Sequence, residues 1–282
     1  MKVIDVNRVI PVVKKLCIDA NYYVGKDVLA KVKEFRAKEE SPTGREIFDL
    51  MLENYKLAAR EQMPICQDTG VAIVFVELGQ DVHLVGGDFY EAINEGVRQG
   101  YKEGFLRKSM VTDPVVERKN TKDNTPALIY TEIVPGEQIK ITVAPKGGGA
   151  ENMSEVKMMS AADGIEGVKN FVVDRIRRSG GNPCPPVVVG VGIGGSFEQC
   201  ALLAKKALLR PLTEKHPEPY WAAVEDEILE RINRLGIGPQ GLGGTTTALA
   251  VSILYKPCHI ASMPVAVNVN CHAHRHETAV IA

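Results

Sequence analysis

The sequence predicts an α+β fold in which mixed sheets are surrounded by helices. Amphipathic helical segments fill residues 1–62, and β-branched runs bounded by Gly, Pro and Asn follow them. These runs alternate irregularly with further helical segments, whereas a doubly wound parallel sheet would need a regular alternation. We expect a single domain over residues 1–282, with residues 1–62 as its helical scaffold portion, because 282 residues can bury a substantial core.

Each expected element follows from its hydrophobic pattern. In the N-terminal portion, apolar residues at three- to four-residue spacing predict helices over residues 3–20, 26–39 and 44–60. β-branched runs predict strands at 71–78, 127–134, 138–145, 186–192 and 263–270, and helical patterns predict helices at 88–105, 164–179, 196–209 and 220–235. Pro135-Gly136-Glu137 predicts an antiparallel hairpin between the second and third strands, and Ser196 is expected to cap the helix that it precedes.

The charge balance excludes several classes of protein. Lys plus Arg number 34 and Asp plus Glu number 35, so the chain lacks the basic excess of a nucleic-acid binder. No run approaches the roughly 18 apolar residues of a membrane span. The start of the chain is interrupted by Asp5, Arg8 and Pro11 and lacks the apolar region of a signal peptide. We therefore expect a cytoplasmic protein whose six Cys are reduced.

Glycine and proline gather in loops that contain half of the cysteines. Cys66 and Cys184 lie within such loops and Cys271 lies beside one, where sulfur and main-chain N–H groups can face a cavity. Cys17 and Cys200 fall on apolar helix faces and are expected to be buried. Cys258 is expected to be structural, because the neighbouring His259 is the better chemical group. The three loop cysteines are the candidates for chemistry.

Two other motifs suggest different chemistry. The spacing Gly190-x-Gly192-x-x-Gly195 has the local context of a dinucleotide fingerprint, but no second strand ending in an acidic residue follows it. The tail Cys271-His272-Ala273-His274-Arg275-His276, with Cys258-His259, supplies zinc-ligand types without a recognisable zinc spacing. A zinc-dependent hydrolase and a plain surface His tract both stay open.

The third possibility is an iron–sulfur site made of Cys66, Cys184 and Cys271. Their separations of 118 and 87 residues are too long for a ferredoxin-type cluster, so the whole fold would have to build the site. Three thiolates on a four-iron cluster leave one iron open as a Lewis acid, which is typical of hydro-lyase chemistry. By spacing alone this is one possibility among several.

The chain resembles the alpha subunit of class I fumarate hydratases and of the similar L-tartrate dehydratase. The resemblance spans nearly the whole chain and rests on uncommon motifs in one fixed order: PICQDTG, FLRKSMV, PKGGGAEN, PCPP, GGTTTALA and PCHIASMPVAVNVNC. It implies an iron–sulfur hydro-lyase alpha-type catalytic domain. It also implies an oxygen-sensitive [4Fe-4S] cluster on Cys66, Cys184 and Cys271, and substrate contacts from Gln67, Asp68, Arg107, Gly149 and His259.

The residue types suit these implied roles, although each also has a plainer explanation. Arg107 offers a planar fork for a carboxylate, or it is a solvated charge. Gly149 can present a main-chain N–H to an oxyanion, or it serves a flexible turn. Asp68 suits general acid–base work or N-capping, and His259 suits substrate binding or a place in the core. Lys146 and Gln240 have no assigned role.

The implied reaction is the reversible hydration of fumarate to L-malate, with dehydration of L-tartrate to oxaloacetate as the alternative. A non-catalytic subunit is the remaining possibility, although such a module has no need of this set of residues. Single-chain members of the family continue into a C-terminal domain, whereas this sequence ends eleven residues after Cys271. We therefore expect a smaller beta subunit as partner in an α2β2 assembly. The strand at 263–270 and the tail at 272–277 are the candidate segments near that interface.

Overall fold

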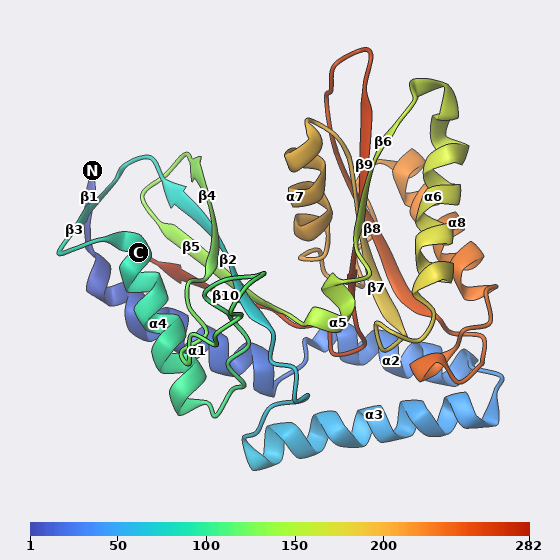
Figure 1. Cartoon of the computed structure of the whole chain (residues 1–282), viewed down its shortest axis with the longest axis horizontal. Helices are drawn as coiled ribbons and strands as arrows, with labels where there is room; N and C mark the ends of the chain where they lie inside the picture. The colour runs from blue at the N-terminus through green and yellow to red at the C-terminus, as the bar shows by residue number, and fades with distance from the viewer. The chain divides into compact units, whose positions relative to one another are not determined.

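The computed structural model describes all 282 residues, and the chain divides into two compact units. Unit 1 comprises Met1–Val24, Asn54–Gly148 and Arg275–Ala282, and unit 2 comprises Gly25–Glu53 and Gly149–His274. Each unit combines a mixed sheet with helices, which confirms the predicted α+β class (Figure 1). The single domain over residues 1–282 stays a prediction.

Unit 1 is built on a four-stranded sheet with helices on one face. Its strand order is β10 (Glu277–Ile281), β5 (Ile139–Lys146), β2 (Val71–Gly79) and β4 (Leu128–Val134). Helices α1 (Val9–Tyr22) and α4 (Phe89–Glu103) pack against each other and supply the cover. A short parallel pair, β1 (Lys2–Asp5) and β3 (Val82–Val85), completes the unit. The sequence did not predict β1, so the first helix begins six residues later than expected.

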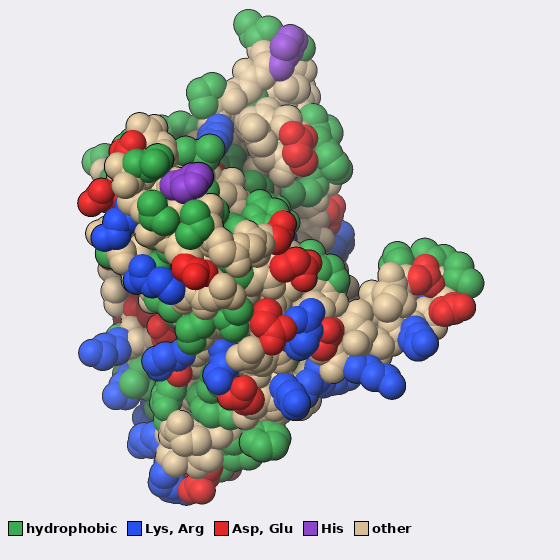
Figure 2. All heavy atoms as spheres, turned by 90° about the vertical axis from the view of Figure 1, so that its left-hand side faces the viewer, with side chains coloured by type: hydrophobic (Ala, Val, Ile, Leu, Met, Phe, Trp, Pro, Cys, Tyr) green, Lys and Arg blue, Asp and Glu red, His purple; other side chains and the backbone are tan.

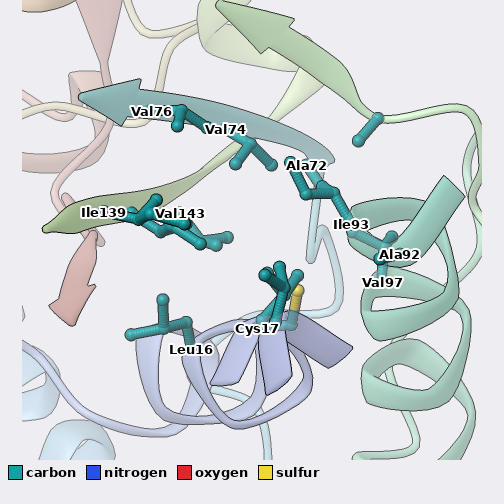
Figure 3. Packing of buried hydrophobic residues seen from close by; sticks show 14 of the residues in the cluster. Leu16, Cys17, Ala72, Val74, Val76, Ala92, Ile93, Val97, Ile139 and Val143 are labelled. Carbon is teal, nitrogen blue, oxygen red and sulfur yellow. The ribbon is translucent and has the colours of Figure 1, made fainter. Parts of the chain in front are cut away.

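The core of unit 1 explains the first helical cysteine. Cys17 is fully buried, and its side chain lies with those of Val97 and Val74 in the space between α1, α4 and the sheet (Figure 3). Burial raises the pKa of this thiol to about 12, because the thiolate would lose its hydration. Cys17 is therefore an inert core residue, as its place on the helix predicted.

The predicted hairpin between residues 127–134 and 138–145 is wrong. β2 lies between the two strands, parallel to β4 and antiparallel to β5. The turn that joins them passes over the end of β2, where Asp81 N donates to Gly136 O and Gly79 N donates to Gln138 O. β2 takes a central position between β5 and β4, and its residues Ala72 to Val76 are all buried.

Unit 2 is a four-stranded sheet with helices on both faces. Its strand order is β6 (Glu155–Met159), β9 (Met263–Asn270), β7 (Val187–Gly194) and β8 (Ala248–Lys256). Helix α7 (Phe197–Ala207) covers one face, and α6 (Gly164–Ser179) and α8 (Pro219–Asn233) cover the other (Figure 1). Helix α2 (Lys26–Lys38), most of α3 (Pro42–Glu61) and the short α5 (Gly148–Glu151) also contribute. β6 and β8 were not predicted.

The glycines of the dinucleotide-like motif serve helix packing. A Cβ on Gly190 would lie 2.1 Å from the carbonyl oxygen of Ala204, and one on Gly192 would lie 2.0 Å from that of Cys200. The bare strand therefore lets α7 approach β7 closely. Ser196 stands at the N-cap position of α7, but its hydroxyl donates to the carboxylate of Glu198 and does not accept a hydrogen bond from the helix backbone.

The segments expected near the partner interface lie largely inside the fold. β9 is a central strand whose residues Pro264 to Val269 are all buried. In the tail that follows, Ala273, His274 and Arg275 are also buried. The face seen in Figure 2 carries Lys, Arg, Asp and Glu interspersed. Ion pairs of unit 1 include Lys14 with Glu103. No helix of the chain is both long and apolar enough to cross a membrane.

Candidate functional site

The loop that leads into β2 joins a thiol and a carboxylate in one turn. The backbone N–H of Asp68 points at Sγ of Cys66, with 3.4 Å between nitrogen and sulfur. Oδ1 of Asp68 accepts from Gly70 N at 3.1 Å, and Oδ2 accepts from Gly148 N at 2.8 Å. Both carboxylate oxygens are thus held by backbone donors, so this side chain has a fixed orientation beside Cys66.

Buried side chains fix the backbone of the same turn. The hydroxyl of Tyr101 donates to the carbonyl oxygens of Thr69 at 2.8 Å and Gly70 at 3.2 Å. Burial raises the pKa of Tyr101, so this hydroxyl stays protonated as a donor. Gly70 has φ of +70°, and a Cβ there would lie 2.6 Å from the backbone of Lys146. Only glycine fits at this crossing.

Arg275 supports the turn from a place that the sequence did not reveal. It is only 4 % exposed, and its Nη2 donates to the backbone oxygen of Asp68. Its Nη1 is buried without a hydrogen-bond partner. In the sequence this residue was hidden within the His tract, and only its long-range contact with Asp68 distinguishes it.

The other predicted substrate residues of unit 1 lie around this turn. The hydroxyl of Thr69 donates to the backbone oxygen of Arg107 at 2.9 Å, so the backbone of Arg107 lies next to the turn. The side chain of Arg107 is exposed. Gln67 is exposed and directly precedes Asp68, and Gly149 directly follows the amide that holds Asp68. The structure therefore brings Gln67, Asp68 and Arg107 together, with Gly149 next in the chain.

Cys184 and Cys271 lie on adjacent loops of unit 2. Cys184 is exposed and has φ of +54°, and its N–H donates to Gly181 O at 3.0 Å. The amide of His272, the residue after Cys271, donates to Cys184 O at 3.2 Å. The two loops meet where β7 begins and β9 ends, since Val188 pairs with Asn270. Two of the three predicted ligands are thus neighbours.

His259 lies at the opposite end of the same sheet. It is exposed in the connection between β8 and β9, where its Nδ1 accepts from Ala261 N at 3.1 Å. That connection follows the carboxyl end of β7, whereas Cys184 precedes its amino end. Eight residues of β7 at roughly 3.3 Å each separate the two positions by more than about 20 Å. Unit 2 does not bring His259 to Cys184 and Cys271.

The remaining cysteines lie outside the turn at residues 66–70 and the loops of Cys184 and Cys271. Cys200 is buried, and burial raises the pKa of its thiol. Cys258 is exposed beside His259, and its thiol donates to Ser262 O at 3.1 Å. His274 is buried with Nδ1 2.8 Å from the amide of Asn270, so the tail is not a surface His tract. No three His, Cys, Asp or Glu side chains converge as a metal site within either unit, and Cys66 belongs to unit 1.

Comparison with known proteins identifies the family. A family described as Fumarate hydratase (Fumerase) matches residues 10–280. A Methanocaldococcus jannaschii protein named "Putative L(+)-tartrate dehydratase subunit alpha" is 42 % identical over 272 residues, 95 % of each chain. The L(+)-tartrate dehydratase subunit alpha of Escherichia coli strain K12 is 34 % identical over 278 residues, 98 % of this chain and 91 % of that one. The chain belongs to the fumarate hydratase family, a family of hydro-lyases.

Proposed function

We propose that this chain is the alpha subunit of an iron–sulfur hydro-lyase that interconverts fumarate and L-malate. The observation that carries the proposal is the turn at residues 66–70, where a thiol and an oriented carboxylate stand two residues apart. A soft metal ligand beside a proton-transfer group suits the addition and removal of water, because a metal held by the thiolate would polarise an oxygen and the carboxylate would transfer the proton. Membership of the fumarate hydratase family supports the same reaction class.

The residues fit a [4Fe-4S] cluster held by Cys66, Cys184 and Cys271. Thiolates are the ligands that such clusters take, and these three cysteines lie in loops outside the two cores. The backbone N–H of Asp68 donates to Sγ of Cys66, which helps to fix the position of this sulfur. Cys17 and Cys200 do not fit, because burial raises the pKa of both thiols. When bound, a cluster with three protein ligands supplies one open iron as a Lewis acid for substrate oxygens.

Asp68 is the proposed proton-transfer residue. Its carboxylate moves a proton to or from the substrate, and the amides of Gly70 and Gly148 keep its oxygens at fixed positions while it does so. Arg107 binds a substrate carboxylate through its planar fork, and Gln67 and the amide of Gly149 contribute further donors. Thr69 holds the backbone of Arg107 next to the turn that contains Asp68.

His259 has a proposed role at the centre of another copy of this chain. Its exposure at the far end of β7 supports an intermolecular role, because a side chain more than about 20 Å from Cys184 cannot touch the same substrate. An α2β2 assembly would supply the second copy. The beta subunit is proposed because the relatives are named as alpha subunits. The cytoplasm, where thiols stay reduced, is the proposed compartment.

Dehydration of L-tartrate to oxaloacetate is the second candidate reaction, since the named relatives are L-tartrate dehydratases. L-Malate and L-tartrate differ in one hydroxyl group, and both present two carboxylates to the same residues. The test is to produce this chain with its partner without oxygen and to measure turnover of fumarate, L-malate and L-tartrate. A higher kcat/KM for fumarate and L-malate supports the first candidate, and a higher value for L-tartrate supports the second. Failure to act on any of them would overturn the proposal.

A further inference from the structure

We propose that Gln240 is a positioning residue that holds Cys184 in the orientation needed to bind a cluster. The inference rests on the proposed function for the identity of the ligand, but its structural basis lies wholly within unit 2. It concerns the Gly-rich segment 236–247, which the proposed reaction does not otherwise use.

The turn that carries Cys184 lies outside the helices and strands of unit 2. Cys184 is exposed, has left-handed backbone geometry and belongs to no helix or strand. A non-glycine residue in this region of backbone space is strained and persists only where its surroundings impose it. The hydrogen bonds to Gly181 and His272 involve the backbone of Cys184 and leave the next residue, Pro185, to be fixed separately.

Gln240 provides that second support. Its backbone N–H and its side-chain Nε2 both donate to the carbonyl oxygen of Pro185, at 2.8 and 3.0 Å. Gln240 itself has φ of +53°, so the residue accepts a costly conformation that lets both of its donors reach one acceptor. Its neighbour Gly241 lies so close to Gly181 that a Cβ there would be 2.7 Å from the Cα of Gly181. Residues 240 and 241 therefore contact the Cys184 turn on both sides.

A buried carboxylate anchors the same segment to the interior of unit 2. Glu39 is fully buried, and its Oε1 accepts from Thr245 N at 2.8 Å and from Ser41 N at 3.0 Å. Its Oε2 accepts from Thr246 N at 2.8 Å. The loop from Gln240 to Thr246 is held at one end by Pro185 and at the other by Glu39. It therefore connects the interior of unit 2 to the turn that carries Cys184. A rigid loop behind a ligand keeps its sulfur at the geometry that a metal requires.

The test uses Gln240→Glu, which keeps the size of the side chain but replaces its N–H donor with an oxygen that repels Pro185 O. Gln240→Gly is the second variant, because glycine tolerates the left-handed backbone and removes only the side-chain donor. Gln80→Glu is the matched control, since Gln80 is exposed at the end of β2. The first measurement is the alkylation rate of Cys184, relative to Cys66, in the cluster-free chain by mass spectrometry.

Both Gln240 variants should change the relative alkylation rate of Cys184 by roughly two- to tenfold, the population shift expected from one lost hydrogen bond. The control should match the wild type. In the cluster-loaded complex, the variants should also lose iron faster and shift the midpoint potential of the cluster. Wild-type rates in both Gln240 variants would overturn the inference, and so would altered alkylation with unchanged cluster behaviour. A wild-type complex that binds no iron would instead refute the proposed function, and the alkylation rates would still decide whether Gln240 positions Cys184.

Discussion

The backbone amide of Gly148 lies 2.8 Å from Oδ2 of Asp68, although the two residues are 80 positions apart in the chain. This contact joins the PKGGGAEN loop to the QDTG loop, and with the amide of Gly70 it leaves neither carboxylate oxygen without a backbone donor. One of the two donors lies in the same turn as Asp68, and the other is the first residue of α5 in the distant PKGGGAEN loop. The arrangement favours a carboxylate whose direction matters.

Replacing Asp68 with Asn should remove turnover and keep the fold. The amide of Asn is the same size as the carboxylate and can still accept one of the two backbone hydrogen bonds, but it cannot take up a proton. General acid–base groups contribute about 10² to 10⁴ in rate, so kcat should fall by that factor. Iron content and thermal unfolding should stay close to those of the wild type. Wild-type kinetics in this variant would contradict the proposed role of Asp68.

Substitution of the loop cysteines should remove iron from the protein, whereas substitution of the helix cysteines should not. Cys66→Ser, Cys184→Ser and Cys271→Ser should each abolish the [4Fe-4S] cluster, because serine replaces a soft thiolate with a poor ligand. Cys17→Ala and Cys200→Ala are the controls: each removes one buried sulfur and should cost stability without changing iron per chain. Iron and acid-labile sulfide in the anaerobic complex provide the measurement. A full complement of iron in the Cys184→Ser protein would be incompatible with the assignment.

The sequence predicted most of the elements around the site but not the relationship between them. Hydrophobic periodicity is a local signal, so the long helices and the buried strands β2, β7 and β9 were recognised. The hairpin was mispredicted because a turn signal is local, whereas the strand order depends on pairing with β2, which lies much earlier in the chain. The short strands β1, β3, β6 and β10 were missed because their patterns cover only four or five residues, and the nine-residue β8 was missed as well.

In the candidate site, too, the sequence indicated some residues, and only the structure identified the others. Motifs pointed to Asp68 and Arg107, and the structure places them beside one turn. Tyr101 and Arg275 had no local signal, because a buried tyrosine on a helix and an arginine in a polar tail are common; only their long-range hydrogen bonds to the turn identify them. The sequence did not reveal that His259 lies at the other end of β7 from Cys184, because sequence order does not say which end of a sheet a loop occupies.

Glu39→Gln should destabilise the protein in a pH-dependent manner. Burial alone would raise the pKa of Glu39, but hydrogen bonds from Thr245, Ser41 and Thr246 lower it on balance. A carboxyl group whose pKa is lower in the folded state contributes stability above its unfolded pKa of about 4.3, and this stability disappears as the pH falls through the folded pKa. At pH 7 the variant should lose about 1–3 kcal/mol of unfolding free energy.

Chemical denaturation of wild type and Glu39→Gln between pH 7 and pH 3 measures this effect. The difference between the two proteins should shrink as the pH drops below about 4.3, because the wild-type carboxylate then becomes protonated as well. Glu40→Gln, a change at the exposed next residue, is the control. A constant difference across this range would show that the charge on Glu39 is not the source of the stability.

Intersubunit complementation tests the proposed place of His259. His259→Asn and Cys184→Ser chains should each be inactive with the partner subunit, for loss of a substrate contact and of the cluster respectively. If His259 serves the centre of another copy, a mixed pair of chains regains one complete centre, with Cys184 from one chain and His259 from the other. Random mixing gives mixed pairs in about half of the dimers, so activity should recover to about a quarter of the wild-type value. A mixture that stays as inactive as its parents would show that His259 does not serve the centre of another copy. Because His259 lies more than about 20 Å from Cys184 of its own chain, this histidine would then have a different function.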